Sequence, residues 1–294
     1  MTSRRDCLIA ALAFLSAPAF AAAPRPALRY MSSNGPDLFN SYAVSLLTLA
    51  LQRAGLPHRL DAMPFDPMSQ GRMELELNHP NARLDVMWTM TSREREQHLQ
   101  PLRIPLDRGL LGWRVALIRK ADLARWQQPL TRDELATRRA GQGLHWPDVD
   151  ILKANGFRVE TAMDTPNLFE MLQAGRIDYF PRSVLEALDE LQTRAASDLM
   201  VAPNFVLRYP AASYAFLGRS HAQLIPPLTR GLESLIQDGS FSRVFRQHFQ
   251  PPLDQLAMNE RRVIDLKNPE LPPQTPLQRS ELWWQPTRRA PVLR

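Results

Sequence analysis

The sequence predicts an α/β protein, because short apolar segments alternate along the chain with segments that have the periodicity of amphipathic helices. Residues 41–54 show the helical spacing, with apolar side chains at positions 43, 46, 47, 50, 51 and 54. Residues 84–88 and 213–217 are compact apolar runs of strand length. Such alternation favours mostly parallel sheets, and the chain has room for two halves of about 100 residues each.

The expected elements follow from these patterns and from their end signals. The segments that read as strands are 27–31, 84–88, 110–118, 140–144, 177–180 and 213–217. The segments that read as helices are 41–54, a stretch that opens at 91, 148–155, 165–174, 228–236 and 242–249. Thr165 followed by Pro166 is a strong helix start. Segments 91–94 and 183–186 fit the Ser/Thr-x-x-Glu capping box.

The composition limits the chemistry that the chain can perform. Lys and Arg number 36 against 30 Asp and Glu, and the net charge of +6 is spread along the chain apart from a basic end, so we expect no nucleic-acid partner. One Cys excludes a disulfide framework and Cys-based metal sites, and the six His lie far apart. No Gly-x-Ser-x-Gly or phosphate-loop motif occurs. We expect no metal and no cofactor, and the missing motifs disfavour a hydrolase.

Residues 1–21 have the pattern of a cleavable signal peptide. Two arginines precede a short apolar run at 8–15, and a small-x-small motif ends at Ala21. Cleavage after Ala21 removes Cys7, the single cysteine. We therefore expect an exported periplasmic protein, which uses either the general route or the twin-arginine route that the arginine pair loosely fits.

The C-terminal end, residues 257–294, differs in composition from the rest. Residues 269–294 contain six prolines and four arginines. Proline at this density opposes helices and central strands, so we expect an extended strap or a loose tail. Trp283 and Trp284 are expected either to pack on the body of the protein or to form a docking patch for a partner.

Taken together, these segments resemble the family 3 solute-binding proteins, the periplasmic amino-acid-type binding proteins of ABC importers. The resemblance covers residues 27–250. It is carried by the order of the elements, by the strand and helix at 27–54, which look like the family's opening unit, and by three further local matches. Segment 84–91 reads LDVMWTMT and is followed by two arginines, similar to the family's Thr-x-Thr strand and its arginine. Segment 168–178 reads LFEMLQAGRID, and segment 238–241 reads DGSF between two helices, as in the family's closing part.

The resemblance implies a type II periplasmic-binding-protein fold, in which a hinge of two crossing strands joins two α/β lobes. Lobe 1 is expected to comprise residues 22–113 and 208–256, and lobe 2 residues 114–207. The implied function is that of a monomer that captures a small polar, carboxylate-bearing, amino-acid-like solute for the permease of an ABC importer. Two alternatives on this fold are a sensory module for a signalling partner and a dehydratase-like lyase.

The resemblance also implies a set of ligand-binding residues in lobe 1. The family's carboxylate-binding arginine falls on Glu94 by spacing, and one inserted residue transfers this role to Arg95. Thr89 and Thr91 are candidate hydroxyl donors to the same carboxylate, although Thr91 is also the expected cap of its helix. The first strand–helix unit supplies an aromatic lid and an alternative ammonium contact from Tyr30, Asp37, Phe39 and Tyr42, of which the last also fits a helix core.

In lobe 2 the family's ligand-binding acid aligns near Ser183, where Arg182 stands and no acid does. Arg95 and Arg182 together favour an anionic or carboxylate-rich solute. Glu186, on which the lyase alternative depends, is assigned to the capping box with Ser183. The glycine-rich turn at 141–148 adds three further candidates, Gly143, His145 and Trp146, which fit either a cleft wall or a tight structural turn.

Overall fold

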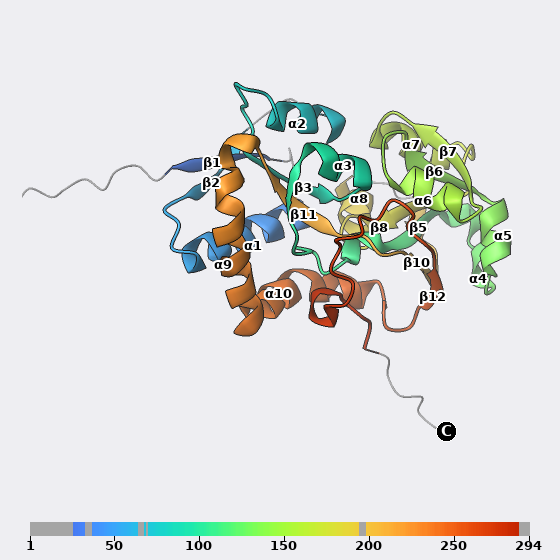
Figure 1. Ribbon diagram of the computed structural model, residues 1–294. Helices are drawn as coiled ribbons and strands as arrows, with labels where there is room; N and C mark the ends of the chain where they lie inside the picture. Colours follow the sequence, from blue (N-terminus) through green and yellow to red (C-terminus); the bar gives the residue numbers. More distant parts are fainter. Residues whose placement is uncertain (1–25, 33–36, 64–67, 69, 194–197, 288–294) are drawn as a thin grey trace, which may run out of the picture.

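The computed structural model describes residues 26–32, 37–63, 68, 70–193 and 198–287. Within this part of the chain two α/β lobes lie side by side, each built on its own sheets (Figure 1). The expected signal peptide, residues 1–21, lies outside the described residues.

The first lobe holds two small sheets next to each other. β1 (Ala27–Met31) pairs in parallel with β2 (Arg59–Met63), and β11 (Ser213–Leu217) lies antiparallel between β3 (Val86–Met90) and β4 (Gln100–Leu102). The Asp85 N–H donates to the Arg29 carbonyl at 2.9 Å and joins the two sheets. The helices of this lobe are α1 (Leu38–Arg53), α2 (Gln70–Leu77), α3 (Arg93–His98), η3 (Arg219–Leu224), α9 (Ile225–Gln237) and α10 (Ser240–Gln255).

The second lobe is organised around a long strand, β5 (Trp113–Arg119). β5 pairs antiparallel with β8 (Phe180–Ser183), β9 (Leu199–Val201) and β10 (Phe205–Arg208). The parallel pair β6 (Arg139–Gly143) and β7 (Arg158–Ala162) extends this sheet, because Ala140 bridges to Tyr179 beside β8. The helices are η2 (Lys120–Asp122), α4 (Ala124–Gln127), α5 (Arg132–Thr137), α6 (Asp148–Ala154), α7 (Thr165–Gln173) and α8 (Ala187–Thr193).

Two crossing strands form the connection between the lobes. The chain enters the second lobe through η1 (Leu110–Gly112) and Trp113 and leaves it at Arg208, which is paired with Trp113. The Tyr209 N–H donates to the Gly112 carbonyl at 3.1 Å, so the two crossings run side by side. This arrangement confirms the predicted α/β fold with two lobes and a hinge.

The predicted preference for parallel sheets is wrong. Among the strands of the described residues, three pairings are parallel and five are antiparallel. The reason lies in the crossings, since β5 leaves the first lobe and β10 returns toward it in the opposite direction. After β10 the chain re-enters the first lobe as β11, which runs opposite to β3 and β4 and therefore pairs antiparallel with both.

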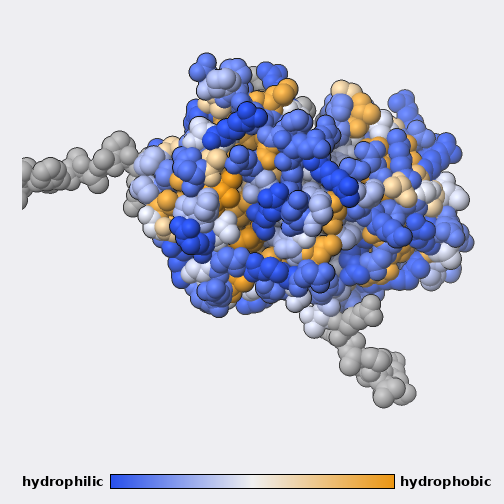
Figure 2. All heavy atoms as spheres, viewed as in Figure 1, coloured by the Kyte–Doolittle hydropathy of each residue, from blue (hydrophilic) through white to orange (hydrophobic). Residues whose placement is uncertain are grey.

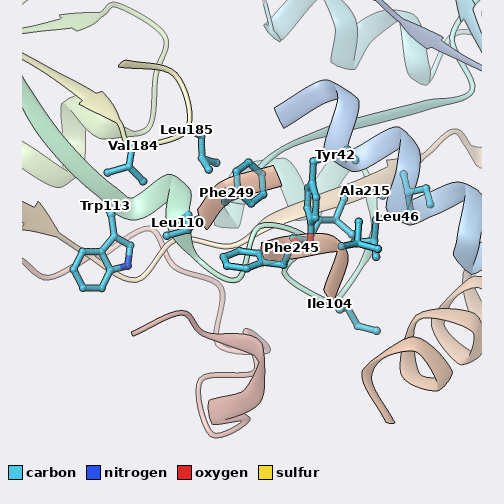
Figure 3. Close-up of a cluster of buried hydrophobic side chains, with 14 of the residues drawn as sticks. Tyr42, Leu46, Ile104, Leu110, Trp113, Val184, Leu185, Ala215, Phe245 and Phe249 are labelled. Carbon is cyan, nitrogen blue, oxygen red and sulfur yellow. Dashed lines mark hydrogen bonds between the residues drawn. The ribbon is translucent and has the colours of Figure 1, made fainter. Parts of the chain in front are cut away.

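One apolar cluster continues from the first lobe into the second at the hinge. Figure 3 shows Tyr42 from α1 beside Phe245 and Phe249 from α10, with Val184 and Leu185 of the second lobe close by. All of these side chains are buried. Apolar packing therefore holds the lobes together near the hinge.

The C-terminal segment folds back on both lobes. β12 (Arg262–Asp265) pairs in parallel with β10, and the Arg93 N–H of α3 donates to the Glu270 carbonyl at 3.1 Å. Near its end the segment forms η4 (Ser280–Leu282), and the Trp284 ring packs on Trp113 with centroids 4.9 Å apart. Trp283 and Trp284 thus contact the body of the protein next to the hinge. Figure 2 shows this face as mostly hydrophilic, with apolar atoms in small separate patches.

Both predicted capping boxes are wrong. Ser92 rather than Thr91 caps α3, since its hydroxyl accepts the Arg95 N–H at 3.1 Å. The Ser183 hydroxyl accepts the Leu185 N–H at 3.2 Å within a turn, and α8 begins only at Ala187. The side chain of Glu186 is therefore not part of a helix cap.

The buried carboxyl group of Asp107, near the hinge, should make the stability of the fold depend on pH. Its buried carboxylate accepts the N–H groups of Gly109, Leu111 and Ser213 at 3.1, 2.6 and 3.4 Å. Burial raises the pKa of Asp107 from 3.8 to about 6, against the lowering effect of these N–H donors. Because the pKa is higher in the folded chain, the resulting stability is fully present below pH 3.8 and is lost as the pH rises through about 6.

The variant Asp107→Asn does not titrate at this position and serves as the reference. We therefore expect the wild type to lose stability relative to Asp107→Asn between pH 4.5 and pH 7. Urea unfolding of both proteins at the two pH values would measure this change. A difference that stays constant between the two pH values would contradict the raised pKa.

Candidate ligand-binding cleft

Three adjoining hollows lie between the lobes. The inner hollow, of about 230 Å³, is lined by the first lobe and by Glu186 of the second. A smaller hollow of about 60 Å³ shares Thr89 and Glu186 with it and is closed by arginines of the second lobe. The outer hollow, of about 370 Å³, shares Trp146 with the smaller one. Since neighbouring hollows share lining residues and each hollow is lined from both lobes, they form one cleft.

Aromatic and acidic side chains line the inner hollow. Tyr30 on β1 and Trp88 on β3 place their ring centroids 5.1 Å apart with a 39° tilt, and Phe39 on α1 lines the same hollow. Asp37 caps α1, because its carboxylate accepts the Asn40 N–H at 2.8 Å. The strand ends and this cap therefore hold the aromatic and acidic groups in place before any ligand arrives.

A buried ionic network forms the second lobe's side of the cleft. Arg114 on β5 lies 2.7 Å from the Asp148 carboxylate at the start of α6, and each side chain is 4% exposed. The Arg114 guanidinium also donates to the Tyr209 hydroxyl at 2.8 Å, and this hydroxyl donates to Asp148. Burial lowers the pKa of Arg114, but Asp148 and Tyr209 outweigh burial, and the pKa is raised. The network keeps Arg114 charged.

Arg182 and Glu186 meet next to this network. Arg182 on β8 binds the Glu190 carboxylate through two 2.7 Å hydrogen bonds, and its guanidinium lies 4.9 Å from the Trp146 ring centroid. Burial lowers the pKa of Arg182, but Glu186 and Glu190 raise it further than burial lowers it. Glu186 lies 3.1 Å from Arg182. Burial raises the pKa of Glu186 in spite of this neighbour, so its charge is costly where it stands.

Arg95 already has a carboxylate partner. Its guanidinium lies 2.6 Å from Glu74 of α2, donates to Gln70 at 3.3 Å and contacts the Met90 carbonyl and the Thr89 hydroxyl. The side chain is 6% exposed. A solute carboxylate that binds Arg95 must therefore share it with Glu74 or displace Glu74.

Most of the residues predicted from the sequence line this cleft. The structure places eight of them on its walls: Tyr30, Asp37, Phe39, Thr89, Arg95, His145, Trp146 and Arg182. They come from four separate parts of the chain, and the fold brings them together.

The other four predicted residues serve the fold. Tyr42 lies in the core of the first lobe and donates its hydroxyl to a backbone carbonyl at 2.6 Å. The Thr91 hydroxyl donates to a glutamate at 2.6 Å, and Ser183 is fully buried at the hinge. Gly143 lies beneath the Trp146 ring, where an added Cβ would come within 2.5 Å of the ring. None of these four residues lines the three hollows.

The cleft also contains residues that sequence reasoning missed. Glu186, which sequence reasoning assigned to a helix cap, lies on its wall and supplies an acid near position 183. Arg114 was visible as a lone charge within an apolar segment, and Trp88 ended a predicted strand. Glu74 gave no signal, because it lies on a helix that local patterns did not predict.

No protein-family model matches the sequence, and no curated protein sequence is significantly similar to it. Solved structures do match. The periplasmic VFT2 domain of Bordetella pertussis BvgS superposes with a TM-score of 0.57 at 18% identity, over 76% of this chain and 94% of that one. An ancestral arginine-binding protein bound to arginine gives a TM-score of 0.54 at 14% identity, over 76% and 99%. This chain has the type II periplasmic-binding-protein fold.

The match extends to a sensor domain. A histidine kinase sensor domain described as similar to periplasmic binding proteins superposes with a TM-score of 0.50 at 14% identity, over 70% of this chain and 85% of that one. Identities at this level show a shared fold. The two-lobed architecture implied by the resemblance is thereby confirmed.

Two kinds of feature are absent from the described residues. No helix there combines the length and apolar character that a membrane crossing requires. No group of three or more His, Cys, Asp or Glu side chains in that part of the chain is placed to hold a metal ion.

Proposed function

We propose that this protein is a periplasmic solute-binding protein that captures a small polar, amino-acid-like solute in the cleft between its lobes. The cleft carries the proposal: its hollows are lined from both lobes, and buried charged side chains stand on its walls. A hinge of two crossing strands lets such lobes close on a solute and exclude water. A similar structure was solved with arginine bound, which supports this class of ligand.

We propose further that lobe 1 comprises residues 22–113 and 208–256 and that lobe 2 comprises residues 114–207. In the same proposal, the protein docks on an ABC permease once it has bound its solute.

The carboxylate expected on the solute has one candidate partner, Arg95, which is shared with Glu74. The sensory alternative is supported by similarity to a kinase sensor domain. Stimulation of a purified permease by the loaded protein separates import from sensing.

Binding of a solute is expected to raise the melting temperature. A ligand present at a hundred times its Kd adds about 2.7 kcal/mol to the free energy of unfolding. For a chain of this size this corresponds to a rise of roughly 5–10 °C in melting temperature. The measurement is a thermal-shift panel of amino acids, dicarboxylates and organic cations, followed by titration calorimetry. Trp88→Ala, in the inner hollow, should reduce the shift, whereas Leu75→Ala, at a side chain that is 76% exposed, should not. A panel without any shift would count against a binding function.

One observation favours the lyase as a second candidate. Glu186 stands in the cleft, and burial raises its pKa, which suits a proton donor. Incubation of cyclic hydroxy acids with the protein, followed by NMR, tests this candidate. Turnover that disappears in Glu186→Gln would support it, and an unchanged substrate spectrum would remove it.

A further inference from the structure

The inner hollow of the cleft has a composition suited to a positive charge. Two carboxylates, Asp37 and Glu186, and three aromatic rings, Tyr30, Phe39 and Trp88, line it. None of the described residues on its wall is Lys, Arg or His. Carboxylates attract a cation by their charge, and the faces of Trp and Tyr attract it through the ring quadrupole. The two kinds of group act here on the same small volume.

Glu186 carries a charge that its neighbours do not balance. Its carboxylate lies 3.1 Å from Arg182 and 3.8 Å from Arg114. Arg182, however, holds Glu190 through two 2.7 Å hydrogen bonds, and Arg114 holds Asp148 at 2.7 Å. Three carboxylates thus share two guanidinium groups. Oε2 of Glu186 is buried and faces both guanidinium groups. The side chain is nevertheless 35% exposed and lines the inner hollow, so the remainder of the carboxylate is open to a donor there.

The excess of negative charge extends over both lobes. Asp37 stands at the N-terminus of α1 in the first lobe, whereas Glu186 precedes α8 in the second. Burial raises the pKa of Asp189 on α8, a hydrogen bond from the Leu38 N–H lowers it, and the charges of Asp37 and Glu190 raise it. The acids of the two lobes are therefore close enough to interact. Acidic ends that face each other repel, and a cation placed between them draws the lobes together.

The outer hollow also has an excess of acids, whereas the smaller hollow is balanced, with two arginines and two acids in its lining. Across all three, the described lining residues include three arginines, Arg95, Arg114 and Arg182. Against these stand seven acids, Asp37, Glu74, Glu94, Asp148, Asp150, Glu186 and Glu270. A protein with a net charge of +6 therefore presents an acidic cleft. Because each arginine is paired with an internal carboxylate, the arginines do not make the cleft attractive to anions.

We infer that the solute has a net positive charge, carried by an organic ammonium or guanidinium group that no carboxylate of the solute balances, and that this group occupies the inner hollow between Asp37 and Glu186, against the rings of Tyr30 and Trp88. The inference rests on the proposed function and adds the charge of the ligand. It reverses the sign expected from Arg95 and Arg182 on sequence alone.

Titration calorimetry with matched probes tests the inference. The pairs are L-arginine with L-citrulline, L-lysine with L-glutamine, and choline with 3,3-dimethylbutanol, together with L-glutamate as an anion. In at least one pair, we expect the cation to bind at least about tenfold more tightly than its neutral partner. No neutral partner and no anion should bind more tightly than the cations. The preference should weaken as salt is added.

Two variants locate the charge preference. Glu186→Gln and Asp37→Asn should each reduce the preference for the cation to about threefold or less, with little change for the neutral probe. Asn remains a good helix cap, so Asp37→Asn keeps α1 intact and decides the matter if Glu186→Gln fails to fold. Glu260→Gln, at an exposed side chain, is the matched control and should leave every affinity unchanged.

The outcomes separate the two proposals. Tighter binding of a neutral probe or of L-glutamate would overturn the inferred charge and leave the binding function standing. Equal effects of Glu186→Gln on both members of a pair would also overturn the inference. If neither these probes nor the wider panel bind, both the charge and the binding function are contradicted.

Discussion

Replacing Gly112 with alanine is expected to lower the free energy of unfolding by about 3 kcal/mol or more. Gly112 lies where the two crossing strands touch, and a Cβ added there would lie 2.1 Å from the Tyr209 carbonyl oxygen. The same pair of residues is joined by the hydrogen bond from the Tyr209 N–H to the Gly112 carbonyl, at 3.1 Å. Because the obstacle is backbone rather than a flexible side chain, the crossings must separate to admit the methyl group.

Urea unfolding and thermal melting would measure this loss, which corresponds to roughly 6–12 °C in melting temperature. Gly71→Ala is the matched control, since nothing lies within 4 Å of an added Cβ in that helix. This control should leave stability unchanged or raise it by up to about 1 kcal/mol. Equal stabilities of the two variants would mean that the crossings are not packed as closely as described.

Elements with a strong local pattern were predictable from the sequence. β1 and β11 have the predicted bounds, because each is a compact apolar run with turn residues around it. α10 shows the limit of local patterns, since it was expected to end at 249 and continues through Pro251 and Pro252 to Gln255. Leu253, in the last turn, is buried in the core, and this tertiary packing offsets the cost of proline in a helix.

The site was predictable in position but not in charge. Thr89, Arg182 and Trp146 lie at or just after strand ends, where ligands bind in α/β folds, so their position followed from the order of elements. The partners of the arginines did not follow, because Glu74 and Glu190 reach them through tertiary structure alone. A sequence shows how many charges a region has, whereas the sign that a ligand meets depends on which charges are already paired.

Arg114 offers the sharpest test of this pairing. Arg114→Met is expected to lower the free energy of unfolding by about 3–5 kcal/mol, because it leaves a carboxylate buried without its cation. Asp148 is 4% exposed at its side chain and would retain the Tyr209 hydroxyl as its one remaining partner in the network. Chemical unfolding would measure the loss, and Arg219→Met, at an exposed side chain, is the control, which should change stability by less than about 0.5 kcal/mol.

Removal of the whole network should cost less than removal of Arg114 alone. In a triple variant, Arg114→Met with Asp148→Leu and Tyr209→Phe, no buried charge or hydroxyl of the network is left unpaired, so we expect most of the lost stability to return. The triple variant also takes one guanidinium and one carboxylate from the cleft wall and leaves Glu186 with Arg182 as its nearest cation. A triple variant as unstable as Arg114→Met would show that Arg114 stabilises the hinge through contacts other than this ion pair.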